Sequence, residues 1–187
     1  MFSYKVNDDI ELKPLQDYHA KELFALIDRN RKHLGEFMPW ERRTQKWEDS
    51  LEYNKAQRKL WAENGAVDCG IFFKGELVGK ISLHEIDHAN RRSSIGYWLS
   101  KDKTGNGIMT RCVAAILDYA FDELDLNHIH IKATPKNKAS WAIAEKLGFV
   151  YEGTLRDDLW NHDHFLDMKL YGMRASEWKK IKEEKQK

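Results

Sequence analysis

The spacing of apolar residues changes several times along the chain, and each change marks an expected element of secondary structure. Apolar and polar residues alternate at residues 2–6 and 10–12, which predicts extended structure. Helical spacing then predicts one helix after a cap at Asp17 and another from about Thr44 to residues 64–65. The residues expected on the buried faces of these helices are Ala20, Leu23, Phe24 and Ile27 in the first and Trp47, Leu51 and Leu60 in the second.

A period of two returns in the middle of the chain. It predicts three strands at residues 67–73, 77–86 and 93–99, joined by tight turns. Residues 107–124 have helical spacing again, with apolar side chains at every fourth position.

The last part of the chain predicts further strands and one short helix. Residues 129–134 alternate as a strand, residues 138–147 form a helix that Gly148 ends, and residues 149–159 and 165–171 form a hairpin. This order of elements predicts an α/β fold of the mixed α+β kind, a sheet with helices on its faces.

Composition narrows the class of protein. A chain of 187 residues suits one domain, expected over residues 1–187, in which about 174–187 form a helical tail with a fraying end from residue 179. The 31 Lys and Arg residues nearly balance the 30 Asp and Glu residues. The net charge therefore gives no electrostatic reason to expect direct binding to nucleic acid or a membrane. No apolar run suits a signal peptide or a membrane span, and the two unlike cysteines indicate reduced thiols, so we expect a cytoplasmic protein.

Residues 84–88, His-Glu-Ile-Asp-His, match the zinc-peptidase pattern H-E-x-x-H. That chemistry requires a helix, because one turn brings both histidines to one metal ion. The flanking residues alternate as a strand instead, which separates His84 and His88 by roughly 13 Å. Two other pairs, His128 with His130 and His162 with His164, are expected on one face of a strand as surface residues. We therefore expect no metal site.

A short basic loop with two glycines stands between the strand that ends at Leu99 and the helix that follows. Gly105 and Gly107 allow the backbone to curl around an anion, and the start of the helix adds free N–H groups and a positive dipole end. Lys101 and Lys103 add positive charge. The P-loop pattern is absent, and Thr110 stands where a dinucleotide fold needs its third glycine. The loop alone is therefore consistent either with phosphate binding of another kind or with a plain helix start after a loop.

Three segments in order resemble the GCN5-related N-acetyltransferase (GNAT) superfamily, and more narrowly its RimJ/RimL branch. They are residues 95–99, residues 104–110 and residues 137–149 with the Glu-Gly that follows. The resemblance covers nearly the whole chain, including residues 38–40. It implies a mostly antiparallel, twisted sheet of six to seven strands, helices on both faces, and a splayed strand pair that holds the cofactor.

The resemblance also implies acetyl-CoA as the cofactor. The residues implied in its binding are Trp98, Leu99, Lys103, Thr104, Gly105, Asn106, Gly107, Ile108, Met109, Thr110, Asn137 and Ser140. The loop backbone would bind the pyrophosphate, and the strand edge at Trp98 and Leu99 the pantetheine arm. Asp102 replaces the Gln or Arg of the family pattern. Without the motif, Asn137 would be interpreted as a turn residue and Ser140 as a helix-capping residue.

The chemistry implied is direct attack of an amine on the acetyl thioester, without an acetyl-enzyme. His84, Glu85 and Asp158 are candidate proton acceptors, whereas Leu159 stands where some relatives carry glutamate. Ser140 could donate a proton to the leaving thiolate, while Asn137 would lie beside it. Trp40, Trp98 and Trp160 could wall the acceptor site, although core packing explains each one alone, and Cys112 is expected in the core.

The acceptor predicted by the resemblance is a protein N-terminal α-amine, as in ribosomal proteins. A small amine such as a polyamine, an antibiotic or a metabolite is the enzyme alternative. A non-catalytic acyl-CoA-binding sensor is the alternative from another class. A homodimer is a further possibility that relatives suggest.

Overall fold

A computed structural model describes residues 3–185 of the chain. The chain divides into two units: the first comprises residues up to Ser82 with residues 97–112, and the second comprises residues 83–96 with everything from Val113 onwards. The strands follow the order β1-β2-β3-β4-β5-β6-β8-β7. The β5–β6 pairing is parallel, and β1–β2, β2–β3, β6–β8 and β7–β8 are antiparallel. The mixed fold is thus confirmed, with eight strands rather than six to seven.

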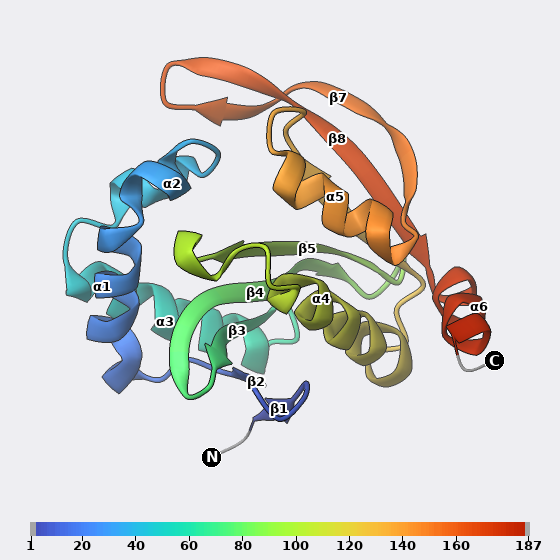
Figure 1. Cartoon of the computed structure of the whole chain (residues 1–187), viewed down its shortest axis with the longest axis horizontal. Helices are drawn as coiled ribbons and strands as arrows, with labels where there is room; N and C mark the ends of the chain where they lie inside the picture. Colours follow the sequence, from blue (N-terminus) through green and yellow to red (C-terminus); the bar gives the residue numbers. More distant parts are fainter. Residues whose placement is uncertain (1–2, 186–187) are drawn as a thin grey trace. The chain divides into compact units, whose positions relative to one another are not determined.

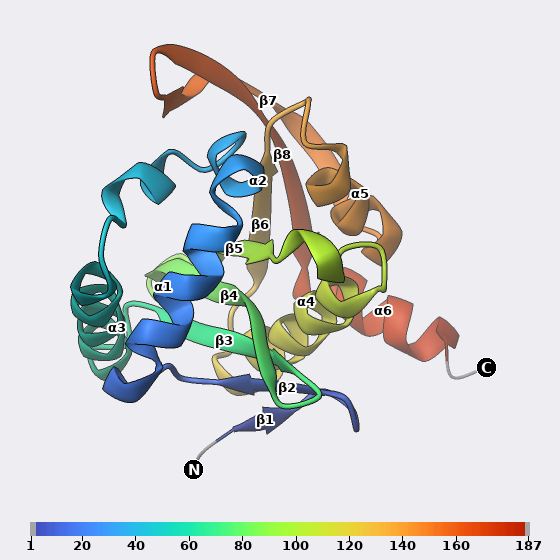
Figure 2. The same ribbon diagram turned by 60° about the vertical axis from the view of Figure 1, so that its left-hand side comes forward.

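The first unit contains the N-terminal strands and helices. Its elements are β1 (Tyr4–Lys5), β2 (Ile10–Lys13), the 3-10 helix η1 (Asp17–His19), α1 (Ala20–Arg29), α2 (Arg31–Gly35), the 3-10 helix η2 (Pro39–Arg43), α3 (Trp47–Ala62), β3 (Val67–Phe73) and the first part of β4 (Glu76–Asp87). To these it adds the end of β5 (Arg92–Leu99), the 3-10 helix η3 (Lys101–Lys103) and the start of α4 (Ile108–Asp118). Helices α1 and α3 lie side by side (Figure 2).

Apolar side chains from α1, α2 and the strands form the core of this unit. Its buried members are Leu15, Leu23, Leu26, Ile27, Leu34, Phe72, Leu77 and Trp98, with Met38 and Trp40 packed against them. The helical spacing of α1 predicted Leu23 and Ile27 correctly. Phe24 is only half-buried.

Helix α3 lies close to its predicted place and Leu51 is half-buried, but the prediction of an apolar buried face was wrong at Trp47 and Leu60. Trp47 and Leu60 are exposed, whereas Ser50 and Asn54 are buried. The physical reason is that α3, which packs against α1, β3 and η1, also covers the backbone just ahead of α1, where carbonyl groups need hydrogen-bond donors. Asn54 donates to the Gln16 carbonyl at 3.5 Å, and the carbonyl of Leu15 accepts from Arg58 at 2.9 Å.

A charged pair is buried under α3. Lys80 Nζ on β4 lies 2.5 Å from Asp68 Oδ1 on β3, and their side chains are only 6% and 5% exposed. Tyr53 of α3 donates its hydroxyl to Asp68 Oδ2 at 3.0 Å, and its ring lies 4.0 Å from the ammonium group. Because burial disfavours a charged ammonium, it lowers the pKa of Lys80, and Asp68 opposes that shift.

The second unit contains the C-terminal strands. Its elements are the remainders of β4, β5 and α4, the π-helix η4 (Tyr119–Glu123), β6 (His128–Ala133), α5 (Lys138–Leu147), β7 (Val150–Asn161), β8 (His164–Arg174) and α6 (Ala175–Lys185). Strand β8 lies between β6 and β7. Figure 1 shows β7 and β8 as a long hairpin with α5 alongside. His162 lies in the turn of this hairpin with φ +62, so it does not share a strand face with His164.

The C-terminal helix α6 is held by hydrogen bonds and ion pairs and continues to Lys185, so the expectation of a fraying end from residue 179 was wrong for residues 179–185. Trp178 is buried and donates to Asp118 Oδ1 at 2.8 Å. Lys182 binds the same carboxylate at 2.8 Å and that of Asp122 at 3.2 Å. Residues 186–187 lie outside the described part of the chain. Among residues 3–185, no helix combines the length and apolar character needed to cross a membrane.

Candidate functional site

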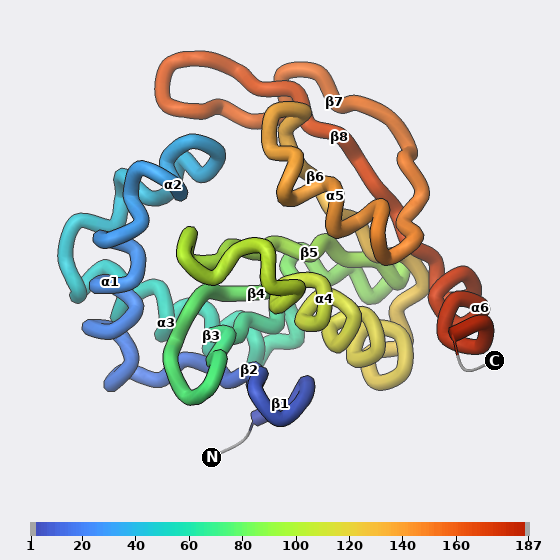
Figure 3. Tube along the Cα trace, viewed as in Figure 1, coloured from blue at the N-terminus to red at the C-terminus, as the bar shows by residue number. Residues whose placement is uncertain are grey.

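The two-glycine loop lies between β5 and α4, as the sequence predicted. Gly105 and Gly107 have φ values of +81° and +67°, in the left-handed region that favours glycine. A side chain at position 105 would point into open space. Figure 3 shows the trace turning through this loop directly into α4. The backbone N–H groups at the start of α4 have no partner within the helix, so this end can bind an anion.

Hydrogen bonds fix the base of the loop to the end of α1. Asn30 is buried and donates to the Leu26 carbonyl at 2.9 Å and to Ser100 Oγ at 3.1 Å. Its own Oδ1 accepts from the backbone N–H of Lys101 at 3.0 Å. The role of Asn30 could not be predicted from the sequence, because no local pattern indicates a contact with residues about 70 positions later in the chain.

The charge of the loop differs from the sequence prediction. Lys103 Nζ lies 3.2 Å from Glu76 and 3.5 Å from Asp102, so two carboxylates offset its charge and raise its pKa. A further cation comes from Arg111, which sequence analysis missed. Its guanidinium donates to the Asn106 carbonyl at 3.0 Å and lies 3.2 Å from where a Cβ on Gly107 would stand. The available signal was its position one helical turn after Gly107.

Burial and hydrogen bonds place the other residues of the loop. Ile108 and Met109 are buried, so their side chains face the core and only their N–H groups can serve a ligand. Thr104 Oγ1 donates to the Lys101 carbonyl at 2.8 Å. The Asn106 amide donates to the carbonyls of Lys103 and Thr104 at 3.3 and 3.2 Å.

Strand β5 meets β4 closely just before the loop. Ser100 donates its N–H to the Val78 carbonyl at 2.7 Å. Any side chain at Gly79 would overlap the Trp98 carbonyl oxygen, so glycine is required for this approach. Trp98 and Leu99 are buried, and the Trp98 ring lies 6.0 Å from that of Trp40. Core packing therefore accounts for the Trp98 side chain, and its backbone is the part available for hydrogen bonding.

Asn137 and Ser140 are placed by the start of α5 in the second unit. Asn137 is the N-cap, and its Oδ1 accepts from the backbone N–H of Ser140 at 3.2 Å. Just ahead of this cap, the Thr134 hydroxyl is buried without a hydrogen-bond partner within the described residues. The cap holds Ser140 in the first helical turn, half-buried.

The H-E-x-x-H segment lies on a strand and a turn, as predicted. Residues 84–87 belong to β4 and His88 to the following turn. The His84 carbonyl accepts a hydrogen bond from the Ser93 hydroxyl of β5 at 2.8 Å. Glu85 is exposed and has φ +55°, which is unusual for a residue with a side chain. No helix presents these two histidines to one metal ion.

Asp158, the third candidate proton acceptor, is already paired. Asp158 on β7 lies 3.2 Å from Lys132 Nζ on β6. Leu159 is opposite Leu166 in the hairpin. Trp160, for which core packing was the first expectation, is 52% exposed and packs edge-on against Phe165 at 4.7 Å. This end of the hairpin therefore presents aromatic surface to the solvent.

Comparison with known proteins identifies the class. Residues 9–150 match a family model described as an acetyltransferase (GNAT) domain. The chain is 34% identical over 179 residues to the putative ribosomal N-acetyltransferase YdaF of Bacillus subtilis (strain 168), covering 95% of this chain and 98% of that one. It is 30% identical over 167 residues to the ribosomal-protein-serine acetyltransferase of Escherichia coli (strain K12), covering 89% and 93%.

A solved structure supports the same class of protein. The microcin C7 self-immunity acetyltransferase MccE, in complex with acetyl-CoA and AMP, aligns with a TM-score of 0.88 at 29% identity, over 91% of this chain and 94% of that one. The chain therefore belongs to the GNAT family of acetyltransferases. Within this family it is of the RimJ/RimL type, as the sequence motifs predicted.

Proposed function

We propose that this protein transfers an acetyl group from acetyl-CoA to a primary amine, and that the amine is the N-terminal α-amine of a protein. The observation that supports this best is the loop of Gly105 and Gly107 at the start of α4, a preformed anion site in a chain of the GNAT family. The relatives named as ribosomal acetyltransferases favour a ribosomal protein as the acceptor. We assign residues 1–187 to a single acyltransferase domain.

The loop residues suit a pyrophosphate. Residues 103–110 would donate backbone N–H groups. Arg111 would supply a positive charge, because Asp102 replaces the Gln or Arg of the family pattern. The backbone of Trp98 and Leu99 would hold the pantetheine arm by strand addition and donate to the carbonyl oxygen during transfer. Acetyl-CoA supplies the acetyl group already activated as a thioester.

Two polar residues at the start of α5 would take part in the reaction. We assign Ser140 as the proton donor to the thiolate and Asn137 as the residue that positions it, since the cap fixes their geometry. A protein α-amine has a pKa of about 7.7–8.0, so a modest base is enough. Of the candidate bases, Asp158 already forms an ion pair with Lys132, which favours His84 or Glu85 as the base. Loss of the acidic limb of the pH–rate profile in either Glu85→Gln or His84→Gln would identify the base.

Direct transfer predicts that Cys112 is dispensable. Cys112 is fully buried, and burial raises the pKa of its thiol to about 12, so almost no thiolate exists at neutral pH. Cys112→Ala is therefore expected to retain turnover within a few-fold, measured as thiol release. An acetylated Cys112 trapped on the reaction path would contradict direct transfer.

Two measurements test the proposal in turn. Thermal stabilisation by acetyl-CoA tests binding, because a ligand that binds only the folded state raises its stability. Thiol release with a panel of N-terminal peptides and small amines then tests turnover. Turnover with peptides supports an α-amine acceptor, whereas turnover with small amines alone supports the metabolite alternative. Binding without turnover across the panel supports a sensor, and no stabilisation contradicts both readings.

Three finer points belong to the same proposal. We place the protein in the cytoplasm, in keeping with its two free cysteines. We expect no direct contact with nucleic acid, because the chain carries a net charge of only +1. A homodimer is tested by light scattering of the whole chain, and a monomer at assay concentrations would contradict it.

A further inference from the structure

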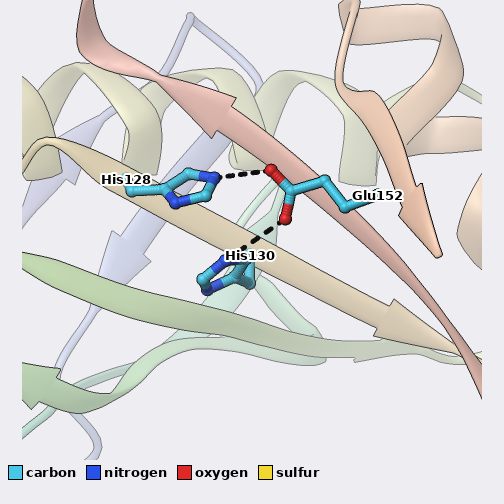
Figure 4. A group of neighbouring side chains, drawn as sticks. All are labelled: His128, His130 and Glu152. Carbon is cyan, nitrogen blue, oxygen red and sulfur yellow. Dashed lines mark hydrogen bonds and ion pairs between the residues drawn. The ribbon is translucent and has the colours of Figure 1, made fainter. Parts of the chain in front are cut away.

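Three metal-competent side chains meet on β6 and β7, at a distance from the H-E-x-x-H motif in the sequence. His128 Nε2 lies 2.9 Å from Glu152 Oε1, and His130 Nε2 lies 3.5 Å from Glu152 Oε2. The two imidazole rings are 4.2 Å apart, as expected for residues two apart on one strand face. Figure 4 shows both ε nitrogens directed at the same carboxylate.

A glycine on the strand between them makes room for this group. Gly172 of β8 is opposite His130 on one side and Val150 on the other. Any side chain at position 172 would overlap Glu152 Oε1 and His128 Nε2. The carboxylate of β7 can therefore cross β8 and meet the histidines of β6 only because residue 172 has no side chain.

The surroundings are compatible with a cation. Three basic residues flank the histidines, and each has its own acidic partner. Arg92 lies 3.3 Å from Asp87, Lys132 lies 3.2 Å from Asp158, and Arg174 binds Glu177 at 2.9 Å. The side chains of the three candidate ligands are between 19% and 31% exposed. An ion could therefore reach them from solvent and still be partly enclosed by the sheet.

We propose that His128, His130 and Glu152 form a binding site for a divalent transition-metal ion of the zinc class. Two imidazoles and one carboxylate are a ligand set that suits Zn²⁺ and leaves a fourth position for water. The potential ligand atoms all lie within 4.8 Å of one another. Bonds of about 2.0–2.2 Å place two ligands of a tetrahedral ion about 3.3 Å apart, so small side-chain rotations suffice.

Such an ion would join β6 to β7 across β8. Because it would bind the folded hairpin and not the unfolded chain, it would stabilise this part of the sheet. The inference is independent of acetyl transfer, since none of these three residues is assigned to the cofactor or to the reaction.

The test is metal binding to the untagged full chain after treatment with a chelator. Calorimetric titration with Zn²⁺ and the visible spectrum on titration with Co²⁺ should each show one equivalent bound. His130→Ala and Glu152→Gln are each expected to weaken binding at least about tenfold, because even outer partners of metal ligands change affinity by about 10–100-fold. Gly172→Ala should weaken it too, by displacing Glu152 and His128.

A matched control is available in the same hairpin. His162 and His164 lie at its turn, with His164 Nδ1 2.7 Å from Asp163. The double variant His162→Ala/His164→Ala should bind Zn²⁺ as the unaltered chain does. Circular dichroism without metal shows whether each variant is folded, and Glu152→Gln keeps the side-chain shape where a truncation fails to fold. No saturable uptake of either ion, or uptake that Glu152→Gln and His130→Ala leave unchanged, would overturn the proposal.

Discussion

Replacing Gly107 with valine is expected to weaken acetyl-CoA binding by at least about tenfold. A β-branched residue at φ +67° is strained by roughly 1–2 kcal/mol, and relief of that strain would move the loop N–H groups. The new side chain would also stand about 3 Å from the Arg111 guanidinium. Coenzyme binding would have to restore the strained loop, and because 1.4 kcal/mol corresponds to a factor of ten, this cost weakens binding by about that factor. Calorimetric titration with coenzyme A measures it.

The matched control for Gly107 is Gly75 in the turn between β3 and β4. Gly75 has φ +85°, and a side chain there would meet nothing within 4 Å. Gly75→Val therefore carries similar backbone strain away from the loop, and it should lower stability without changing the affinity for coenzyme A. Equal affinities of Gly107→Val and the unaltered chain would exclude the loop as the phosphate site.

Removing the buried ammonium group of Lys80 is expected to give the largest loss of stability. Lys80→Ala would leave Asp68 buried without its partner, which typically costs about 3–5 kcal/mol. Chemical denaturation measures the difference in the free energy of unfolding. Lys59 on α3 and Glu63 at its C-cap form an exposed pair 4.0 Å apart, which provides the control. Lys59→Ala should change stability by no more than about 0.5 kcal/mol.

A combined replacement separates burial of charge from loss of packing. Tyr53→Phe, Asp68→Leu and Lys80→Met together remove both charges and the hydroxyl that Asp68 accepts from. Replacing a whole buried ion pair with apolar residues is often neutral or stabilising. The triple variant should therefore recover most of the stability that Lys80→Ala loses. If it is as unstable as Lys80→Ala, packing of the lysine stem rather than charge explains the loss.

The sequence predicts the elements with a clear period and misses those without one. The strands from residue 67 to 99 and the helix α5 follow from alternation and helical spacing, and α5 even begins and ends where expected. Helix α2 has five residues, too few to show a period. The buried face of α3 could not be predicted from apolar spacing, because it includes polar side chains such as Asn54, which donates to a backbone carbonyl.

The same limit applies to the sites. The glycines of the loop are visible in the sequence because a backbone requirement selects the residue locally. Asn30 and Arg111 are not, since their roles depend on contacts that only the fold creates. His128 and His130 were correctly expected on one face of a strand. Glu152 joins them across β8, and the interposed strand comes later in the chain than either partner.

The position of β8 has a consequence for biosynthesis. Strand β8 pairs with β6 and β7 on its two sides, yet it is the last strand to leave the ribosome. Until residues 164–174 emerge, β6 presents an unpaired edge of alternating Ile129 and Ile131, a template for pairing with other nascent chains. Messages truncated within this hairpin should accordingly yield insoluble product, and chaperone dependence should end when β8 is complete.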